Sequence, residues 1–160
     1  MERKMINIET NKRVWSPGKR ADPFLAYNFL VEIDSITVAS FTDVSGLSIE
    51  AQVERKSFGG ENDREYAFIS QVKFSDITFK KGISDEKMLW EWYMQVIQGK
   101  IQRKDGSIYL LDPSGQSVAA IWDFYGACPI KWEGPVFSAS SNNVAVETLV
   151  FTHQGLSRSK

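Results

Sequence analysis

One amphipathic helix, predicted over residues 84–99, lies among segments that otherwise alternate like β-strands. Ser84 is a good N-cap residue, and Asp85 and Glu86 put negative charge in the first turn, where the helix dipole favours it. Gly99 predicts the end of the helix. The apolar side chains form one stripe at helical spacing: Leu89, Trp92, Tyr93, Val96 and Ile97. A chain with one helix and many strands is restricted to mainly β architectures.

Period-two alternation predicts the strands. In the first, Tyr27, Phe29, Val31 and Ile33 share one face. Further strands are predicted at 36–41, 47–58, 72–79, 108–111, 118–125, 128–132 and 144–153. In the 47–58 strand, Ile49, Ala51 and Val53 share one face. The last is apolar on both faces, which favours a core on one side and a partner on the other. The sum is a mainly β fold in which two packed β-sheets form a barrel-like sandwich with one flanking helix.

Turn signals separate these strands. Asp105-Gly106 predicts a hairpin turn, and residues 112–115, with the sequence Asp-Pro-Ser-Gly, predict the next turn. Residues 58–63 are polar and rich in glycine, which predicts a long hairpin loop or flap.

Residues 1–21 are predicted to be an N-terminal arm, and residues 22–160 a single domain. The arm is polar and basic, is interrupted by Ser16-Pro17-Gly18, and carries Val14 and Trp15 as anchors. Two interpretations stay open at this point. The arm is a disordered terminus, or it docks on a neighbouring copy, because an exposed tryptophan is costly to leave in water.

The sequence offers no catalytic, cofactor or metal site, and the prediction is that the chain is not an enzyme. His153 is the only histidine and has no nucleophile or carboxylate at a recognisable spacing, so a structural or solvent-facing role is expected. Cys128 is expected to be a small buried hydrophobe, and one cysteine with one histidine cannot form an ordinary zinc site. A net charge of −1 argues against a general nucleic-acid binder.

Other features favour an interaction protein. Trp90 lies off the apolar stripe of the helix, since adjacent helix positions are about 100° apart, and it predicts a second contact surface. Many strands in a small domain also leave edges that another chain can pair. The residues have neither a membrane-spanning apolar run nor the apolar core of a secretory signal near the N-terminus, so we expect synthesis in the cytoplasm and no membrane insertion.

Several segments in fixed order carry a family resemblance. They are Asp22-Pro23-Phe24, residues 28–33 (NFLVEI), 41–47 (FTDVSGL), 77–85 (ITFKKGISD), 89–93 (LWEWY), 99–107 (GKIQRKDGS), 110–112 (LLD), 129–135 (PIKWEGP), 147–149 (ETL) and 153–156 (HQGL). This ordered set resembles the tail tube family of contractile phages and phage-tail-like contractile injection systems, a family related to the hemolysin-coregulated protein of type VI secretion.

The resemblance implies a structural protein that forms six-membered rings, whose sheets join into a continuous barrel and whose rings stack into a hollow tube. It implies a contractile sheath, a baseplate and a spike as partners, and effector protein or DNA as luminal cargo. The chain would reside in an assembled particle, released by lysis in some systems. By analogy, contacts between rings are expected at the arm and at the 58–64 loop. The predicted inter-ring residues are Trp15, Phe58, Gly59, Gly60, Glu61, Asn62, Asp63 and Arg64. A separate subunit or ring interface is expected at Trp90.

Two alternatives accompany this interpretation. The arm is longer than expected for a plain family member, so the chain could instead be a tube-initiating subunit at the baseplate. In a different functional class, a β-barrel of this size could bind a small ligand or single-stranded nucleic acid. That alternative predicts a monomer with a basic or apolar cavity.

Overall fold

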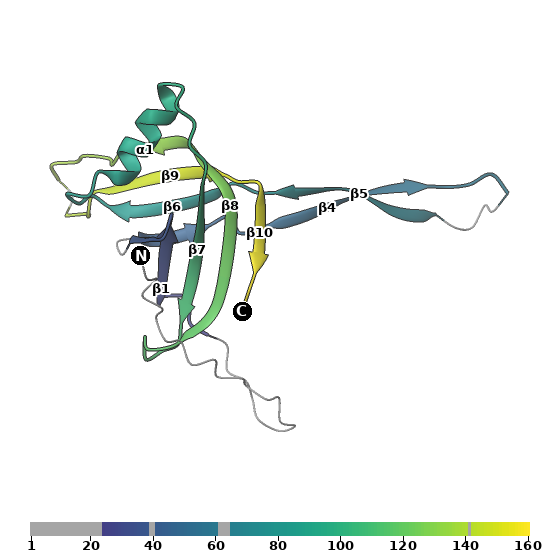
Figure 1. Ribbon diagram of the computed structural model, residues 1–160, viewed down its shortest axis with the longest axis horizontal. Helices are drawn as coiled ribbons and strands as arrows, with labels where there is room; N and C mark the ends of the chain where they lie inside the picture. Colours follow the sequence, from purple (N-terminus) through teal and green to yellow (C-terminus); the bar gives the residue numbers. More distant parts are fainter. Residues whose placement is uncertain (1–23, 39–40, 61–64, 141) are drawn as a thin grey trace.

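The computed structural model describes residues 24–38, 41–60, 65–140 and 142–160, as ten strands and one helix in that part of the chain (Figure 1). The predicted arm therefore lies outside the described residues. The elements are β1 (Phe29–Ile33), β2 (Ile36–Val38), β3 (Phe41–Ser45), β4 (Ile49–Lys56), β5 (Tyr66–Phe74), β6 (Ile77–Gly82), α1 (Met88–Ile97), β7 (Lys104–Leu111), β8 (Val118–Glu133), β9 (Val146–Thr152) and β10 (Gly155–Arg158).

An eight-stranded antiparallel sheet forms the body of the molecule. Its strand order is β2-β1-β7-β8-β9-β6-β3, with β10 paired to β8. In Figure 1, β1 and β7 run at a steep angle to β6 and β9, and the curved β8 belongs to both layers. The two layers pack against each other without closing into a barrel, and α1 lies beside them. The mainly β prediction with one flanking helix is confirmed.

The bend of β8 was not predicted. The sequence indicates two strands, 118–125 and 128–132, but the structure has one continuous strand of 16 residues. Gly126, at φ +61°, takes a left-handed conformation that lets the strand change direction, and a register shift follows between Pro129 and Lys131. A local turn signal therefore marks a bend inside a strand, because long-range pairing on both sides keeps the chain extended.

Aromatic rings fill the space between the layers. The Phe79 ring centroid lies 5.0 Å from that of Phe151 and 6.1 Å from that of Phe124. The predicted inward face of the first strand is confirmed for Val31 and Ile33, whereas Tyr27 precedes β1 and is exposed. The core residues other than the three phenylalanines are Val31, Ile33, Ile77, Leu89, Trp92, Ile108, Ala127 and Leu149. Cys128 is buried, as expected.

Helix α1 begins later than predicted. Leu89 and Trp92 are buried, and the Trp92 ring lies 5.1 Å from that of Phe151, so the predicted stripe faces the core. Ile97, at the end of the stripe, is exposed, and that part of the prediction is wrong. The expected end is confirmed, since Gly99 has φ +84° and its N–H donates to the Val96 carbonyl oxygen at 3.0 Å.

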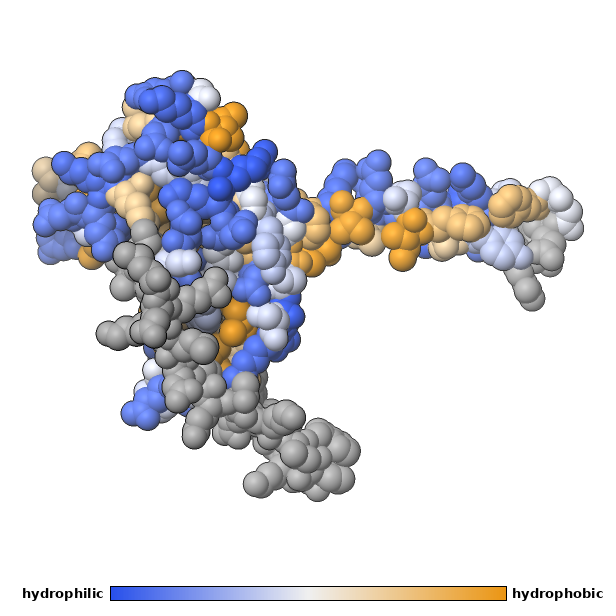
Figure 2. Space-filling view, in the orientation of Figure 1, coloured by the Kyte–Doolittle hydropathy of each residue, from blue (hydrophilic) through white to orange (hydrophobic). Residues whose placement is uncertain are grey.

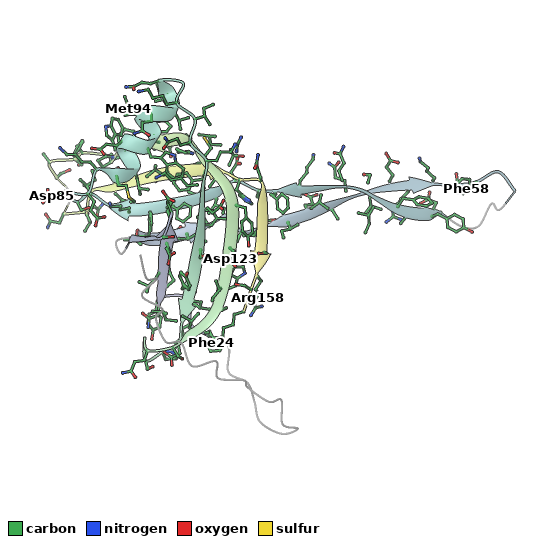
Figure 3. All side chains as sticks on the ribbon, in the orientation of Figure 1. Phe24, Phe58, Asp85, Met94, Asp123 and Arg158 are labelled. Carbon is green, nitrogen blue, oxygen red and sulfur yellow. The ribbon has the colours of Figure 1, made fainter. Side chains whose placement is uncertain are left out.

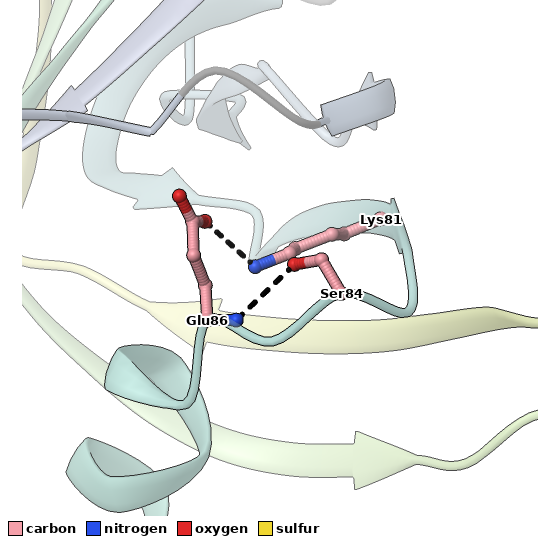
Figure 4. A network of polar contacts seen from close by, with 3 residues as sticks. All are labelled: Lys81, Ser84 and Glu86. Atoms are coloured by element: carbon pink, nitrogen blue, oxygen red, sulfur yellow. Dashed lines mark hydrogen bonds and ion pairs between the residues drawn. The ribbon is translucent and has the colours of Figure 1, made fainter.

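Ser84 does not cap the helix. Its hydroxyl accepts a 3.4 Å hydrogen bond from the Glu86 N–H within an irregular connection, and Lys87 holds the N-cap position (Figure 4). The cause is Lys81, which is 1% exposed and whose ammonium group lies 3.0 Å from the Glu86 carboxylate. A buried ammonium group needs a partner, and the ion pair holds Glu86 outside the helix.

The Asp105-Gly106 hairpin prediction is also wrong. Both residues lie inside β7, which pairs with β1 and β8. A Cβ added to Gly106 would overlap the ring of Phe124. Gly106 is thus required for close approach of a core ring to the backbone rather than for a turn.

The turn at residues 112–115 is confirmed. The Asp112 carboxylate accepts hydrogen bonds from the hydroxyls of Ser114 and Ser117, at 2.7 and 3.0 Å, and from the Gln116 N–H at 3.1 Å. These bonds, those from Ser114 above all, lower the pKa of Asp112 to about 2. Gly115 follows at φ +71°.

Candidate functional site

Strands β4 and β5 form a hairpin (residues 49–74) that projects far from the body of the molecule (Figure 1). It pairs only with itself among the described residues, as a two-stranded sheet. Phe58 is at its far end (Figure 3). The predicted loop is therefore the tip of a long hairpin; Gly59 and Gly60 form a turn there, and Glu61, Asn62, Asp63 and Arg64 lie outside the described residues.

The base of the hairpin is tied to the body by main-chain contacts. Gly46, at φ +90°, lies so close to the Asp76 carbonyl oxygen that no Cβ would fit. Across the base, the Ser75 N–H donates to the Ser48 carbonyl oxygen at 3.1 Å. The predicted single strand 72–79 is thus two strands, β5 and β6, which separate at Ser75 and Asp76.

His153 braces this base from the body. One ring nitrogen, Nε2, lies 2.8 Å from the Ser75 carbonyl oxygen, and Nδ1 lies 3.0 Å from the Gly155 carbonyl oxygen. Its ring also lies 5.6 Å from the ring of Phe74, at the root of β5. The side chain is buried and faces backbone oxygens, so its role is structural, as the sequence predicts.

Apolar side chains on the hairpin are exposed. Register places Val53 opposite Ile69 and Ala51 opposite Val72 on one face, while Glu50 opposite Lys73 and Gln52 opposite Gln71 lie on the other. Figure 2 shows the result, with hydrophobic residues along one side of the hairpin and hydrophilic residues along the other. The exposed apolar residues of this face are Ile49, Val53, Ile69 and Val72, and Phe58 is exposed near the tip. Tyr66 and Phe68 are also exposed, but the register places them on the other face, opposite Lys56 and Glu54.

A hairpin that is exposed to water and packs on nothing else has little stability of its own. An isolated two-stranded ribbon is marginally stable, and its two outer edges leave backbone N–H and C=O groups unpaired. A continuous exposed apolar surface of this kind marks an interaction site. The sequence predicts the tip and the face that Ile49, Ala51 and Val53 share, but it misses the continuation of that face on β5, because the register shift beside Ile69 interrupts the alternation of that strand.

A second surface lies on the outer side of α1. Trp90 is 40% exposed and lies off the core stripe, as predicted. Its ring is not free, however: it packs edge-on against Trp132 of β8, whose indole Nε1–H donates to Glu147 at 2.9 Å. The loop that follows β8 exposes Val136 and Phe137, for which the sequence predicts no contact. Their only sequence signal is an apolar pair between Pro135 and a serine-rich stretch.

A third feature is a cavity at the open side of the sandwich. Its volume is about 310 Å³, and it lies between β3 and the β1-β7-β8 layer. Apolar side chains form most of its wall: Phe29, Val44, Leu47, Ile108, Leu110 and Trp122. Asp43 is the one charged residue among the described residues of the wall.

Polar side chains on the sheet pair with each other. Tyr109 donates to Glu32 across β1 and β7 at 3.2 Å, and Ser107 donates to Asp123 across β7 and β8 at 2.5 Å. Burial, and next the charge of Glu32, raise the pKa of Tyr109.

In the described part of the chain, no group of histidine, cysteine and carboxylate side chains could hold a metal ion, and no helix is long and apolar enough to cross a bilayer.

Several solved structures have an architecture similar to that of this chain. The sheath–tube complex of an extracellular contractile injection system, PVC, contains a chain similar to this one, with a TM-score of 0.78 and 25% identity over 85% of this chain and 90% of that chain. The tube-terminating cap of the anti-feeding prophage, AFP, gives a TM-score of 0.76 and 27% identity over 88% and 93% of the two chains. Hcp1 from Flavobacterium johnsoniae shares the fold, with a TM-score of 0.54 at 15% identity over 83% and 95%.

A comparison with curated proteins gives no match. The family model described as T4-like virus tail tube protein gp19 matches residues 25–157. That range includes every described strand except the last residue of β10, together with α1 and the projecting hairpin. The chain therefore belongs to the T4-like tail tube protein family, a family of structural tube proteins with an Hcp-like fold.

Proposed function

We propose that this chain is the main tube subunit of a contractile injection system or contractile tail, and that six copies form a ring and the rings stack into a hollow tube. The projecting hairpin carries the proposal, because its apolar face is exposed and its outer edges have no strand partner within the described part of the chain, so another surface is needed to cover them. Membership of the tail tube family supports the same assembly.

The contacts are head-to-tail in both directions. A heterologous contact between copies closes into a ring when the rotation between them closes, and it continues as a filament when it does not. The unpaired edges of β2 and β3 within the described sheet are available to neighbours in the ring. In this arrangement the tip residues Phe58, Gly59 and Gly60, with residues 61–64 and Trp15 of the arm, contact the adjacent ring. Trp90 lies at a subunit or ring interface.

The proposed partners are a contractile sheath, a baseplate and a spike, with effector protein or DNA as cargo in the lumen. The similar chains come from a sheath–tube complex, a baseplate and a tube-terminating cap, which supports the first two partners. The subunit would be made in the bacterial cytoplasm and reside in the assembled particle. We propose residues 22–160 as one tail-tube domain and residues 1–21 as an arm added to it.

A tube-initiating role at the baseplate is the second candidate. A chain of the AFP baseplate is as similar as the sheath–tube chain, with a TM-score of 0.78 and 25% identity over 87% of this chain. Purified protein distinguishes the candidates, since a main subunit stacks into tubes of indefinite length whereas an initiator stops at one ring.

Sedimentation velocity and negative-stain electron microscopy of the purified full chain test the proposal. We expect rings with sixfold symmetry that stack end to end as the concentration rises. A protein that stays monomeric at high concentration and binds a small ligand in the cavity between β3 and β7 would contradict it and support the ligand-binding alternative.

A further inference from the structure

The cavity between β3 and the β1-β7-β8 layer has the properties of a socket for one large apolar side chain. Its volume of about 310 Å³ is at the lower end of the range for ligand pockets. Ile108 at its wall is 4% exposed, so the cavity reaches the edge of the core. Protein interiors are close-packed, and an apolar opening of this size forfeits contacts until something fills it.

The chain outside the described residues ends next to this socket. The description begins at Phe24, and Ala26 is part of the cavity wall. Twenty-three residues precede Phe24, and Trp15 is the only tryptophan among them. Eleven residues from Trp15 to Ala26 span at most about 36–40 Å when extended, which is enough to reach a socket on an adjacent copy.

The charge of the arm is opposite to the charge at the wall of the cavity. Residues 10–21 contain Lys12, Arg13, Lys19 and Arg20 and no acidic side chain. Asp43 carries the one charge that the described residues bring to the wall; it is exposed and lies beside the apolar surface. An aromatic anchor in an apolar pocket with a charged partner at the rim is the usual composition of an interface hot spot.

We infer that Trp15 of one copy occupies the cavity of a neighbouring copy, with the basic residues around it facing Asp43. This inference rests on the proposed tube, in which a neighbouring copy is always present. A side chain on one surface that fits a pocket on another makes a heterologous contact, the kind that extends a filament. The hairpin is the competing occupant, but its apolar residues spread along a ribbon, which suits a flat surface better than a socket for one side chain.

Disulfide trapping in assembled tubes tests the inference. In a Cys128→Ala background, a tagged chain with Ser16→Cys, which keeps Trp15, is assembled with an untagged chain carrying Thr42→Cys, since Thr42 lies on the exposed wall of the cavity. Oxidation should give a heterodimer of the two chain sizes. The matched control pairs Ser16→Cys with Ser70→Cys, an exposed position on the hairpin, and should give none.

Each outcome decides the inference. Tubes without a 16–42 disulfide overturn it and leave the proposed tube intact. A chain that carries both Ser16→Cys and Thr42→Cys gives a second readout: a disulfide that forms only within that one chain also overturns the inference, because the arm then fills its own cavity. If no rings form at all, the proposed function fails and the inference falls with it. If the inference holds, Asp43→Asn should lower the yield of the trapped heterodimer by about two- to fivefold, because it removes one exposed ion pair between the two copies.

Discussion

The ring of Trp90 lies edge-on to the ring of Trp132, with centroids 4.6 Å apart and ring planes at 70°. Trp90 closes the outer side of the contact between α1 and β8, and it is still 40% exposed, which leaves room for the proposed contact with another subunit. Trp92, two positions later, is 3% exposed and donates from its indole Nε1–H to the Gln102 carbonyl oxygen at 2.8 Å.

Replacing these two tryptophans with alanine should separate folding from assembly. Trp92→Ala opens a cavity in the core and should lower the free energy of unfolding by about 3–5 kcal/mol. Trp90→Ala loses one aromatic pair and should cost about 0.5–1.5 kcal/mol, while it weakens ring formation. Urea denaturation of the dilute monomer measures the first effect and sedimentation velocity the second. Equal losses of monomer stability would mean that the two faces of the helix are assigned wrongly.

The apolar face of the hairpin should contribute to assembly and not to the monomer. Ile69 is 73% exposed, so Ile69→Ser should leave the free energy of unfolding within about 0.5 kcal/mol of wild type. It should weaken contact between copies by about 1–2 kcal/mol for each interface. Lys73→Ser, on the polar face of the same strand, is the matched control and should assemble normally. The concentration at which rings appear gives the comparison, and similar values for the two variants would exclude the apolar face as a contact.

Shortening the tip should affect stacking more than ring closure. Deletion of residues 59–62 removes the predicted inter-ring loop and leaves the apolar face of β4 and β5 in place. We expect single rings with few tubes under conditions in which the wild type forms tubes, as counted in electron micrographs. Tubes of normal length would place the inter-ring contact elsewhere.

Gly106 should tolerate no side chain. A Cβ there overlaps the Phe124 ring, so Gly106→Ala forces the core to shift and should cost about 1–3 kcal/mol. At Gly59, near the hairpin tip, an added Cβ would meet no described atom within 4 Å, and Gly59→Ala should stay within about 0.5 kcal/mol of wild type. Thermal unfolding of the two variants checks this, and an unaffected Gly106→Ala would show that β7 does not take this register.

The Asp112 turn should make stability depend on pH in the acid range. Its pKa is about 2 in the folded protein and 3.8 as the ordinary value. Because the folded pKa is the lower one, the ionised carboxylate stabilises the fold above about pH 4, and that contribution is lost as the pH falls through 2. Asp112→Asn should lack this part of the dependence. Unfolding midpoints of both proteins between pH 2 and pH 5 measure it, and parallel curves would contradict the assignment.

Local sequence patterns correctly predict those elements whose tertiary contacts favour the same structure as the local pattern does. The apolar stripe of α1 and the inward face of β1 follow from spacing alone, because each packs one face on one core. The predictions that are wrong share a physical cause. Gly106 and Gly126 have the composition of turns, but pairing with distant strands holds both inside strands. Ser84 is a good cap by residue type, yet the buried charge of Lys81 determines the connection.

The candidate site was predicted in part for the same reason. The glycine-rich tip of the hairpin has a strong local signal, and the loop was placed correctly. The shared face of Ile49, Ala51 and Val53 follows from the alternation of β4. The addition of Ile69 and Val72 to that face depends on the register between β4 and β5, which shifts between Gln52 and Val53 and cannot be obtained from either segment alone. The partner of Trp90 on β8 is 42 residues away in the chain, beyond the reach of helix periodicity.

The central claim is that the projecting hairpin is a contact between copies in a stacked tube. A cryo-electron microscopy map of the assembled full chain tests it most directly. We predict rings of six with Ile69 and Val72 covered by a neighbouring subunit. A tube in which the hairpin stays in solvent, or a protein that forms no rings at any concentration, would contradict the claim.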